Sequence, residues 1–262
     1  MTVSLLFSTY NYPGALRLLL SSIKIQRRRP DQILIADDGS TDKTREIIDA
    51  FRTETGMNVI HAWQPDDGFR KSIVLNKALA QCTSDYVVQI DGDCIMHPRF
   101  IEDHCDHAVS NGFLYGSRSH INEANVQRVI QEGQFRFGFF AKGLTKRTRN
   151  LWIPTLARRN KPEDRVSSKL RGCNMSYWYK DAVAVNGYDE TFTGWGNEDS
   201  EFAHRLFNIG VLPKRLRYAG IIYHLWHRER NKNTREANAA LEAITIENKR
   251  KWAEQGLNQH TS

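Results

Sequence analysis

The sequence predicts an α/β fold built on a mainly parallel sheet. Four apolar runs rich in β-forming residues lie within the first 93 residues, and segments with helical periodicity separate them. This alternation is typical of βαβ units. Two of the runs, QILIA and VVQI, are continuously apolar, which indicates strands covered on both faces of the sheet. A chain of 262 residues is long enough to bury such a core.

The elements of the first half follow in order along the chain. After the first strand, Pro13 begins a helix, because proline is favoured in the first helical turn. Ser40 or Thr41 can cap the helix that follows the second strand. We expect strands over residues 3–9, 32–38, 57–63 and 84–93, and helices over 13–26, 41–52 and 66–82.

The rhythm of strands and helices changes after about residue 118. A helical pattern covers residues 122–142, whereas residues 143–171 have no clear periodicity. A further helix is expected to begin at Asn197 or a neighbour and to end at Gly210. The last expected elements are a strand that runs into a turn, over 216–227, and an amphipathic helix over 234–255.

The composition excludes several classes of protein. Hydrophobic residues make up 40% of the chain and charged residues 26%, which argues against disorder, collagen and a coiled coil. No apolar run approaches the roughly 20 residues of a membrane span, and the N-terminus lacks the basic region of a signal peptide. We therefore expect a cytoplasmic protein with reduced, structural cysteines rather than a zinc site. The cysteines are Cys82, Cys94, Cys105 and Cys173.

The net charge of +7 belongs to one segment, residues 142–171. Ten Lys and Arg stand there against Glu163 and Asp164, a net charge of +8, so the rest of the chain is close to neutral. Two interpretations remain open. The segment contacts something anionic, such as phosphate, lipid headgroups or nucleic acid, or it is a solvated loop that happens to be rich in arginine.

Polar residues gather where three of the predicted strands end, and ligands bind at the carboxyl ends of parallel strands. The clusters are Thr9-Tyr10-Asn11, Asp37-Asp38-Gly39-Ser40 and Asp91-Gly92-Asp93. No glycine-rich dinucleotide motif or P-loop accompanies them. Asp91 and Asp93 repel each other unless a cation is near, and their oxygens suit Mg²⁺ or Mn²⁺ together with substrate phosphates. A solvated acidic turn is the alternative for this DXD motif.

Two motifs of the second half carry further polar groups. In GWGNEDSE, the dipole of a helix start explains Glu198 and Asp199 but not Trp195 between two glycines. An exposed indole beside a carboxylate is a common sugar-binding arrangement. In HLWH, His224 and His227 converge on one metal if the segment turns, because residues three apart on a straight strand face opposite sides. One buried and one surface histidine is the alternative.

Together these motifs resemble the family 2 glycosyltransferases of GT-A fold. The resemblance rests on FSTYNYPGAL, ILIADDGSTDKT, the strand ending in DGD, GYDETFTGWGNEDSEF and YHLWH, and covers roughly residues 3–119 and 170–230. The second half is similar to β-1,4-galactosyltransferases, chondroitin polymerase and polypeptide GalNAc-transferases. The resemblance implies a nucleotide-sugar-binding half over 1–119, an acceptor-binding half over 120–233 and a C-terminal helix within 234–262.

The resemblance also implies roles for individual residues. Asp199 is the expected catalytic base with Glu198 beside it, and Trp195 and Gly196 are expected at the acceptor. The residues expected at the nucleotide are Thr9, Tyr10, Asn11, Asp38, Arg70, Asn76 and Asp91. The expected ligands of Mn²⁺ or Mg²⁺ are Asp93, His224 and His227.

The implied activity is inverting, metal-dependent transfer of a hexosyl or N-acetylhexosaminyl group from a UDP-sugar to a hydroxyl of a glycan or lipid-linked glycan. The expected pathway is assembly of a bacterial surface polysaccharide, lipopolysaccharide or lipooligosaccharide. Two other classes remain as alternatives. A nucleotidyltransferase shares strand-end carboxylates and a metal but does not need GWGNED. A nucleic-acid-binding protein would use residues 142–171, which lack an ordered aromatic platform, so no nucleic acid partner is expected.

Residues 133–158 interleave aromatic side chains with Lys and Arg. Such a composition suits an anionic bilayer interface, where rings sit at headgroup depth. We therefore expect peripheral attachment to the inner face of the cytoplasmic membrane. The alternative is that these aromatics are core of the acceptor-binding half. They include Phe135, Phe137, Phe139, Phe140 and Trp152.

Overall fold

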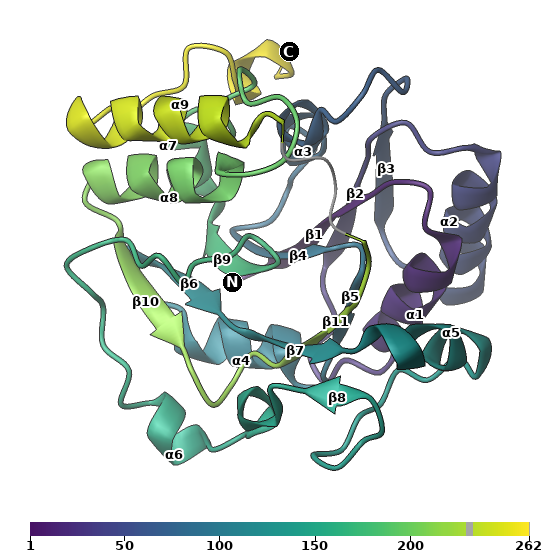
Figure 1. The fold of residues 1–262 in the computed structure, drawn as a ribbon. Coiled ribbons are helices and arrows are strands. Elements are labelled where there is room, and N and C mark those ends of the chain that lie inside the picture. The colour runs from purple at the N-terminus through teal and green to yellow at the C-terminus, as the bar shows by residue number, and fades with distance from the viewer. Residues whose placement is uncertain (229–232, 262) are drawn as a thin grey trace.

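A seven-stranded sheet forms the centre of the computed structural model, which describes residues 1–228 and 233–261 (Figure 1). Its strand order is β10-β6-β9-β4-β1-β2-β3. Neighbouring strands are parallel except at β9, which runs antiparallel to both β4 and β6. The strands are β1 (Val3–Thr9), β2 (Gln32–Asp37), β3 (Val59–Trp63), β4 (Tyr86–Asp91), β6 (Gly112–Gly116), β9 (Asn174–Trp178) and β10 (Leu212–Leu216).

Helices cover both faces of this sheet (Figure 1). One face packs against α1 (Pro13–Lys24), α2 (Asp42–Thr55) and α4 (Phe100–His107). The other face packs against α3 (Lys71–Leu79), α7 (Tyr179–Ala184) and α8 (Glu198–Asn208), and α9 (Arg235–Glu247) lies on α8. The remaining helices are α5 (Glu123–Gln131), α6 (Pro154–Ala157), and the short 3₁₀ turns η1 (Arg147–Asn150) and η2 (Leu257–Gln259).

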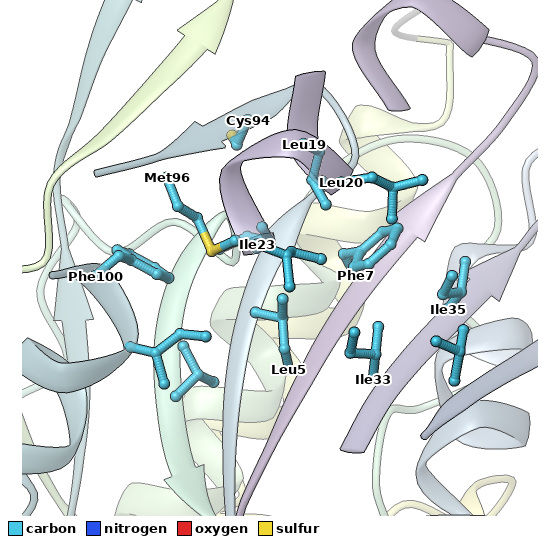
Figure 2. Close-up of a cluster of buried hydrophobic side chains, with 14 of the residues drawn as sticks. Leu5, Phe7, Leu19, Leu20, Ile23, Ile33, Ile35, Cys94, Met96 and Phe100 are labelled. Atoms are coloured by element: carbon cyan, nitrogen blue, oxygen red, sulfur yellow. The ribbon is translucent and has the colours of Figure 1, made fainter. Parts of the chain in front are cut away.

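The continuous apolar strands divide their side chains between these two faces. Leu5 and Phe7 of β1 pack with Leu19 and Ile23 of α1, as Figure 2 shows, whereas Leu6 between them packs with the opposite cluster. Successive residues of a strand point to opposite faces, so a strand buried on both sides needs an apolar residue at every position. This is the reason why apolar runs without alternation predicted the central strands correctly.

A second, four-stranded sheet has the order β5-β11-β7-β8. Its core also contains apolar residues of α1 and α5, which seat it beside the large sheet. It therefore fixes β11, which carries His224, close to the carboxyl end of β4. Its strands are β5 (Cys94–Met96), β7 (Arg118–Ile121), β8 (Leu144–Thr145) and β11 (Ile222–Leu225).

Two helices end earlier than the sequence predicts. The helix expected over 122–142 stops at Gln131, where Gly133 takes a positive φ of 61° and the Gln134 N–H donates back to the Val129 carbonyl. The helix expected over 234–255 stops at Glu247 in the same way. Both ends are left-handed C-caps that close the last helical turn, and the periodicity beyond them is not helical.

The strand expected over 216–227 is interrupted. Tyr218 and Gly220 have positive φ values of 66° and 59°, and they separate β10 from β11. The large sheet takes strands from both 1–119 and 120–233, so these two ranges share one sheet. The division into 1–119, 120–233 and 234–262 stays a prediction, and its residues 229–232 and 262 lie outside the described residues.

A buried ion pair within α8 includes an arginine that joins this helix to the loop after α7. The Arg205 guanidinium and the Glu201 carboxylate are both fully buried, with Nε–Oε1 and Nη2–Oε2 distances of 2.8 Å. Arg205 also donates to the carbonyls of Val185 and Gly187. We expect Arg205→Met to lower the free energy of unfolding by about 3–5 kcal/mol, because it leaves a buried carboxylate unpaired. Urea denaturation would measure this loss, with Arg45→Met on the exposed face of α2 as the control. Equal losses of stability in the two variants would contradict the prediction.

Candidate functional site

The carboxyl ends of β1, β2 and β4 meet at one edge of the large sheet. Thr9 pairs with Asp37, and Ser8 pairs with Asp91, as parallel registers require. Gly92 lies so close to this edge that a Cβ there would be 2.3 Å from the Ser8 carbonyl oxygen. The polar strand ends identified in the sequence therefore form one site.

Asp38 is buried at this edge and is oriented by two donors. Its carboxylate accepts hydrogen bonds from the Gln64 amide at 2.7 Å and from the Arg70 backbone N–H at 2.9 Å. Tyr10 lies at the same edge and donates its hydroxyl to Asp66 at 2.8 Å. A carboxylate and a tyrosine ring held beside each other suit the ribose and base of a nucleotide.

Asn11 joins the loops that follow β1 and β2. It has a positive φ of 43°, its N–H donates to the Ser40 hydroxyl at 2.9 Å, and its side-chain oxygen accepts from the Thr41 N–H at 3.0 Å. These bonds use the side chain of Asn11 for the loop itself. The structure thus gives Asn11 a positioning role in the loops at this edge of the sheet, and its contact with a nucleotide stays a prediction.

Asn76 does not reach this site. It is fully buried on α3, donates to the Tyr188 carbonyl and the Glu190 carboxylate at 2.8 Å, and accepts from the Tyr188 N–H at 2.8 Å. These bonds satisfy the amide and attach α3 to residues 188–190, so the nucleotide role expected for Asn76 is corrected to a structural one. The side chain of Arg70 is also engaged, in an ion pair with Asp67 at 2.9 Å.

Three side chains converge as expected for a metal site. Asp93, His224 and His227 each bring one ligand atom to within 4.8 Å of the others. Asp93 Oδ2 lies 3.4 Å from His224 Nε2 and 3.0 Å from His227 Nε2. The strand β11 ends at Leu225, so His227 lies beyond the strand, and both imidazoles lie near the Asp93 carboxylate.

The chemistry of these donors fits a divalent cation. Burial lowers the pKa of His224 and the cation of Arg118 lowers it further, against the carboxylate of Asp93. Burial opposes ionisation of Asp93, but His224, His227 and Arg118 hold the pKa of that carboxyl well below its usual range. A neutral imidazole and an ionised carboxylate are the forms that bind a metal. One carboxylate with two imidazoles can hold a divalent transition-metal ion such as Mn²⁺, whereas Mg²⁺ prefers oxygen ligands.

Lys71, at the start of α3, joins three carboxylates beside this metal cluster. Its ammonium lies 3.2 Å from Asp91, 3.2 Å from Glu198 and 3.5 Å from Asp199. Burial alone would lower the pKa of Lys71, yet the carboxylates of Asp199, Asp91 and Glu198 outweigh burial and raise it well above its ordinary value. Lys71 is therefore a fixed positive charge at the centre of the site.

Asp199 sits in a fitted recess at the start of α8. Its Oδ1 accepts a hydrogen bond from the Gln89 amide at 3.4 Å, and the Gln89 carbonyl oxygen accepts from Tyr177 and Tyr188. A Cβ on Gly172 would lie 2.0 Å from the Asp199 Cγ, so only glycine leaves room for the carboxylate. Burial raises the pKa of Asp199 to about 7, with Glu198 and Asp91 adding to the effect and Lys71 opposing it.

Trp195 and Gly196 form an exposed turn above this recess. The Trp195 side chain is 42% exposed. Gly196 has a φ of 109°, which disfavours other residues, and its carbonyl accepts from the Asn238 amide of α9 at 2.9 Å. The turn thus holds a partly exposed indole four residues before Asp199 in the chain, and its role at the acceptor stays a prediction.

A family model described as "Glycosyl transferase family 2" matches residues 4–163, which is more than half of the chain. The chain belongs to glycosyl transferase family 2. A second model, described as "N-terminal domain of galactosyltransferase", matches residues 156–228. The two matches confirm both parts of the resemblance drawn from the motifs. The second match also includes His224 and His227 of the metal cluster.

Curated relatives of this family 2 member include polysaccharide synthases. It is 25% identical to the chondroitin synthase of Escherichia coli over 79% of the chain and 32% of that protein. It is 23% identical to the validoxylamine A glucosyltransferase of Streptomyces hygroscopicus subsp. limoneus over 80% of the chain and 48% of that protein. The chain spans about a third to about a half of the length of these two relatives.

Solved structures similar to this family 2 member share its fold. TarS of S. aureus, in complex with UDP, superposes with a TM-score of 0.66 at 18% identity, covering 99% of the chain and 68% of TarS. The mannosyltransferase PcManGT of Pyrobaculum calidifontis, with GDP-Man and Mn²⁺, gives 0.61 at 15% identity, covering 94% and 63%. The GT-A fold expected from the sequence is confirmed.

In this family 2 member, some aromatic side chains of residues 133–158 are buried and others are exposed. Phe137 is buried in the core of the small sheet, and Phe135 packs against it. Phe140 is 83% exposed, while the exposed ring of Trp152 lies under the Arg99 guanidinium at 4.4 Å. Part of the segment is therefore core, as the alternative reading held. Among the described helices none has the length and apolar composition needed to cross a bilayer.

Three residues at the site were missed by sequence reasoning. Lys71, Gln89 and Gly172 surround Asp199, yet none belongs to a motif that points to chemistry. Gln89 carried one signal, as the single polar residue inside the buried run VVQI. A buried amide must be hydrogen-bonded, so it could have been marked as a site neighbour.

Proposed function

We propose that this family 2 member is an inverting, metal-dependent glycosyltransferase that moves a sugar from a UDP-sugar to a hydroxyl of a glycan. One observation carries the proposal. Asp199, a carboxylate whose pKa burial raises to about 7, lies in the same site as the metal cluster and the strand-end edge that holds Asp38. A general base works best when its pKa is near the working pH.

The strand-end residues would bind the nucleotide of the donor. Asp38 offers a fixed carboxylate to the ribose or uracil, with Thr9 and Tyr10 beside the base. Asp91 is expected near the ribose, at the end of β4. That TarS was solved with UDP and PcManGT with GDP-Man supports a nucleotide-sugar donor here.

Asp93, His224 and His227 would hold Mn²⁺ or Mg²⁺ against the diphosphate of the donor. A bound divalent cation would neutralise the negative charge that builds on the departing diphosphate. The protein's part is to present a charged carboxylate and a neutral imidazole from two different sheets. Lys71 keeps the neighbouring carboxylates of Asp91, Glu198 and Asp199 compatible with one another.

Asp199 would accept the proton of the acceptor hydroxyl as that oxygen attacks the anomeric carbon. Gln89 and Gly172 orient its carboxylate, and Trp195 would pack on the acceptor ring. A single displacement inverts the anomeric configuration, so an α-linked UDP-hexose or UDP-N-acetylhexosamine gives a β-glycoside. Glu198 is the partner carboxylate that keeps Lys71 charged.

A screen of UDP-sugars for Mn²⁺-dependent release of UDP tests the proposal, with the product's anomeric configuration read by NMR. UDP release with a β-linked product supports it. Nucleotide transfer with release of inorganic diphosphate would instead identify a nucleotidyltransferase, and retention of configuration would exclude the single displacement.

The pH dependence of turnover tests the role of Asp199. We expect turnover to fall as the pH drops through about 7, because protonation removes the base. Lys71→Met should move this acid limb to higher pH, since Lys71 opposes the rise of the Asp199 pKa. Lys77→Met on the same helix is the matched control. An acid limb that stays in place in Lys71→Met would contradict the assignment.

The setting of the reaction is also a proposal. Relatives named chondroitin synthase, hyaluronan synthase and succinoglycan biosynthesis protein support a role in bacterial surface polysaccharide or lipopolysaccharide assembly. Peripheral docking on the inner membrane face stays a prediction that rests on the cations of residues 142–171 and on Phe140. Liposome co-sedimentation checks it: binding should need anionic lipid and fall steeply with salt. A protein that ignores anionic vesicles at low salt is not docked this way.

A further inference from the structure

The ten Lys and Arg of residues 142–171 are all exposed. In the described parts of the chain, none of them lies within 4.0 Å of a carboxylate oxygen. Some cations outside this segment are paired, for example Lys24 with Glu54 and Arg128 with Glu132. The excess positive charge is therefore available to a ligand.

Part of this charge stands at the edge of the metal cluster. Lys146 Nζ lies 3.2 Å from His120 Nε2, and the ring of His120 is 5.4 Å from that of His224. The Arg149 guanidinium donates to the Arg118 carbonyl at 3.0 Å. The side chain of His120 therefore lies between Lys146 and the expected metal ligand His224.

Two further cations, Arg118 of β7 and Arg171 of the basic segment, stand beside the catalytic recess. Arg118 Nη1 lies 3.2 Å from the Cys173 sulfur, and the next residue back, Gly172, touches Asp199. Arg171 precedes that glycine and projects into solvent. We name Arg118, Lys146, Arg149 and Arg171 the site cations.

The site cations repel one another. Burial and the neighbouring charges of Arg149, Arg118 and Arg171 lower the pKa of Lys146. Burial and the charges of Arg215, Arg118 and Arg171 likewise lower the pKa of Arg149. Lys146, Arg149 and Arg171 have no carboxylate oxygen within 4.0 Å among the described residues, so a bound anion would relieve this repulsion.

The position of the site cations separates them from the nucleotide. The nucleotide residues follow β1, β2 and β4, whereas the site cations come from β7, η1 and the loop before β9. In the large sheet β9 and β6 lie on the side of β4 away from β1 and β2. In the small sheet, β11 with His224 lies between β5, which follows Asp93, and β7 with Arg118, so we place an anion at the site cations on the acceptor's side of His224.

We propose that Arg118, Lys146, Arg149 and Arg171 form a subsite for an anionic group, phosphate or carboxylate, carried by the acceptor glycan. Three of the four are arginines, whose planar guanidinium pairs with both oxygens of such groups. The inference rests on the proposed glycosyl transfer and adds the chemical class of its acceptor.

The test compares acceptors that differ only in one charge. Each pair is a uronate-terminated oligosaccharide with its carboxyl-reduced form, or a phosphorylated oligosaccharide with its dephosphorylated form, given with a saturating UDP-sugar. We expect the anionic member to have a KM lower by about tenfold, and the two types of pair distinguish carboxylate from phosphate. Equal KM values within every pair would overturn the proposal.

The variant Lys146→Ser/Arg149→Ser should raise the KM for the anionic acceptor by about tenfold, with a much smaller effect on the KM for its neutral counterpart. Arg158→Ser/Arg159→Ser is the matched control: it removes two exposed arginines of the same segment, next to α6, far from α8 in Figure 1. A change in the KM for the donor alone would assign the site cations to the diphosphate and overturn the subsite.

Two further readouts separate the outcomes. Binding of the uronate and phosphate oligosaccharides, measured by calorimetry without donor, should be weakened in the Lys146→Ser/Arg149→Ser variant even where no sugar is transferred. Absence of turnover with every pair is then a failure of the proposed function, whereas turnover without charge preference is a failure of the subsite. Loss of anionic liposome binding with unchanged acceptor kinetics would assign these cations to a membrane and overturn the proposal.

Discussion

Asp199→Asn is expected to lower turnover by about 10² or more while the affinity for the donor changes little. The amide keeps the size and shape of the side chain, so the recess formed by Gly172 and Gln89 remains filled. It removes the ability to take the acceptor proton, which is the group's proposed contribution to the rate. Steady-state kinetics with donor binding by calorimetry would measure both quantities.

Glu198→Gln is the informative comparison for Asp199→Asn. Both carboxylates contact the Lys71 ammonium, at 3.2 Å and 3.5 Å, so each variant removes one carboxyl group from around that lysine. A base is distinguished by a much larger loss in Asp199→Asn. Near wild-type turnover in Asp199→Asn, with a large loss in Glu198→Gln, would transfer the role to Glu198.

Removal of divalent metal is expected to abolish transfer, and Mn²⁺ should restore it. Asp93→Asn should lower turnover by roughly 10² at fixed Mn²⁺, because Asp93 supplies the only carboxylate of the three-residue cluster. Calorimetric titration with Mn²⁺ gives a readout that is independent of transfer. Binding should weaken as the pH falls, since protons compete for the imidazoles of His224 and His227.

Asp181→Asn on α7 is the control for Asp93→Asn, because it makes the same chemical change in a partly buried aspartate outside the site. Thermal denaturation should show that both variants fold. Full activity in excess EDTA would reject the metal mechanism. Unchanged Mn²⁺ affinity in Asp93→Asn would reject this set of ligands.

The sequence could place the site because its chemistry lies at strand ends. Asp38, Asp91 and Asp93 follow apolar runs, and a parallel sheet brings such ends to one edge whatever the loops do. Asp199 and the two histidines stand in motifs of the sequence, and the structure places Asp199 at the start of α8 and both histidines beside Asp93. Most of the candidate site could therefore be predicted from the strand ends and the motifs.

What the sequence could not predict depends on orientation between elements. In the sequence, Asn76 stands between the strand ends at Asp38 and Asp91. In the structure, the orientation of α3 directs its side chain toward Tyr188. The same orientation brings Lys71 to three carboxylates from β4 and α8. Periodicity gives the apolar face of a helix and not the partner of each polar residue on it. The helix ends at Gly133 and Lys249 were missed because left-handed caps depend on a single residue's φ.

A substitution at Gly172 would stop sugar transfer without adding or removing a charged group. Gly172→Ala adds one methyl group where only the Asp199 carboxylate now fits, and the φ of residue 172 does not demand glycine. The carboxylate would be pushed away from Gln89 and from the position where it meets the acceptor. The variant would keep every charged group of the site and the residues proposed to bind donor, metal and acceptor, so we expect it to hold a complete, unreacted ternary complex. Such a trap would let the true acceptor be isolated by its affinity and identified by mass spectrometry.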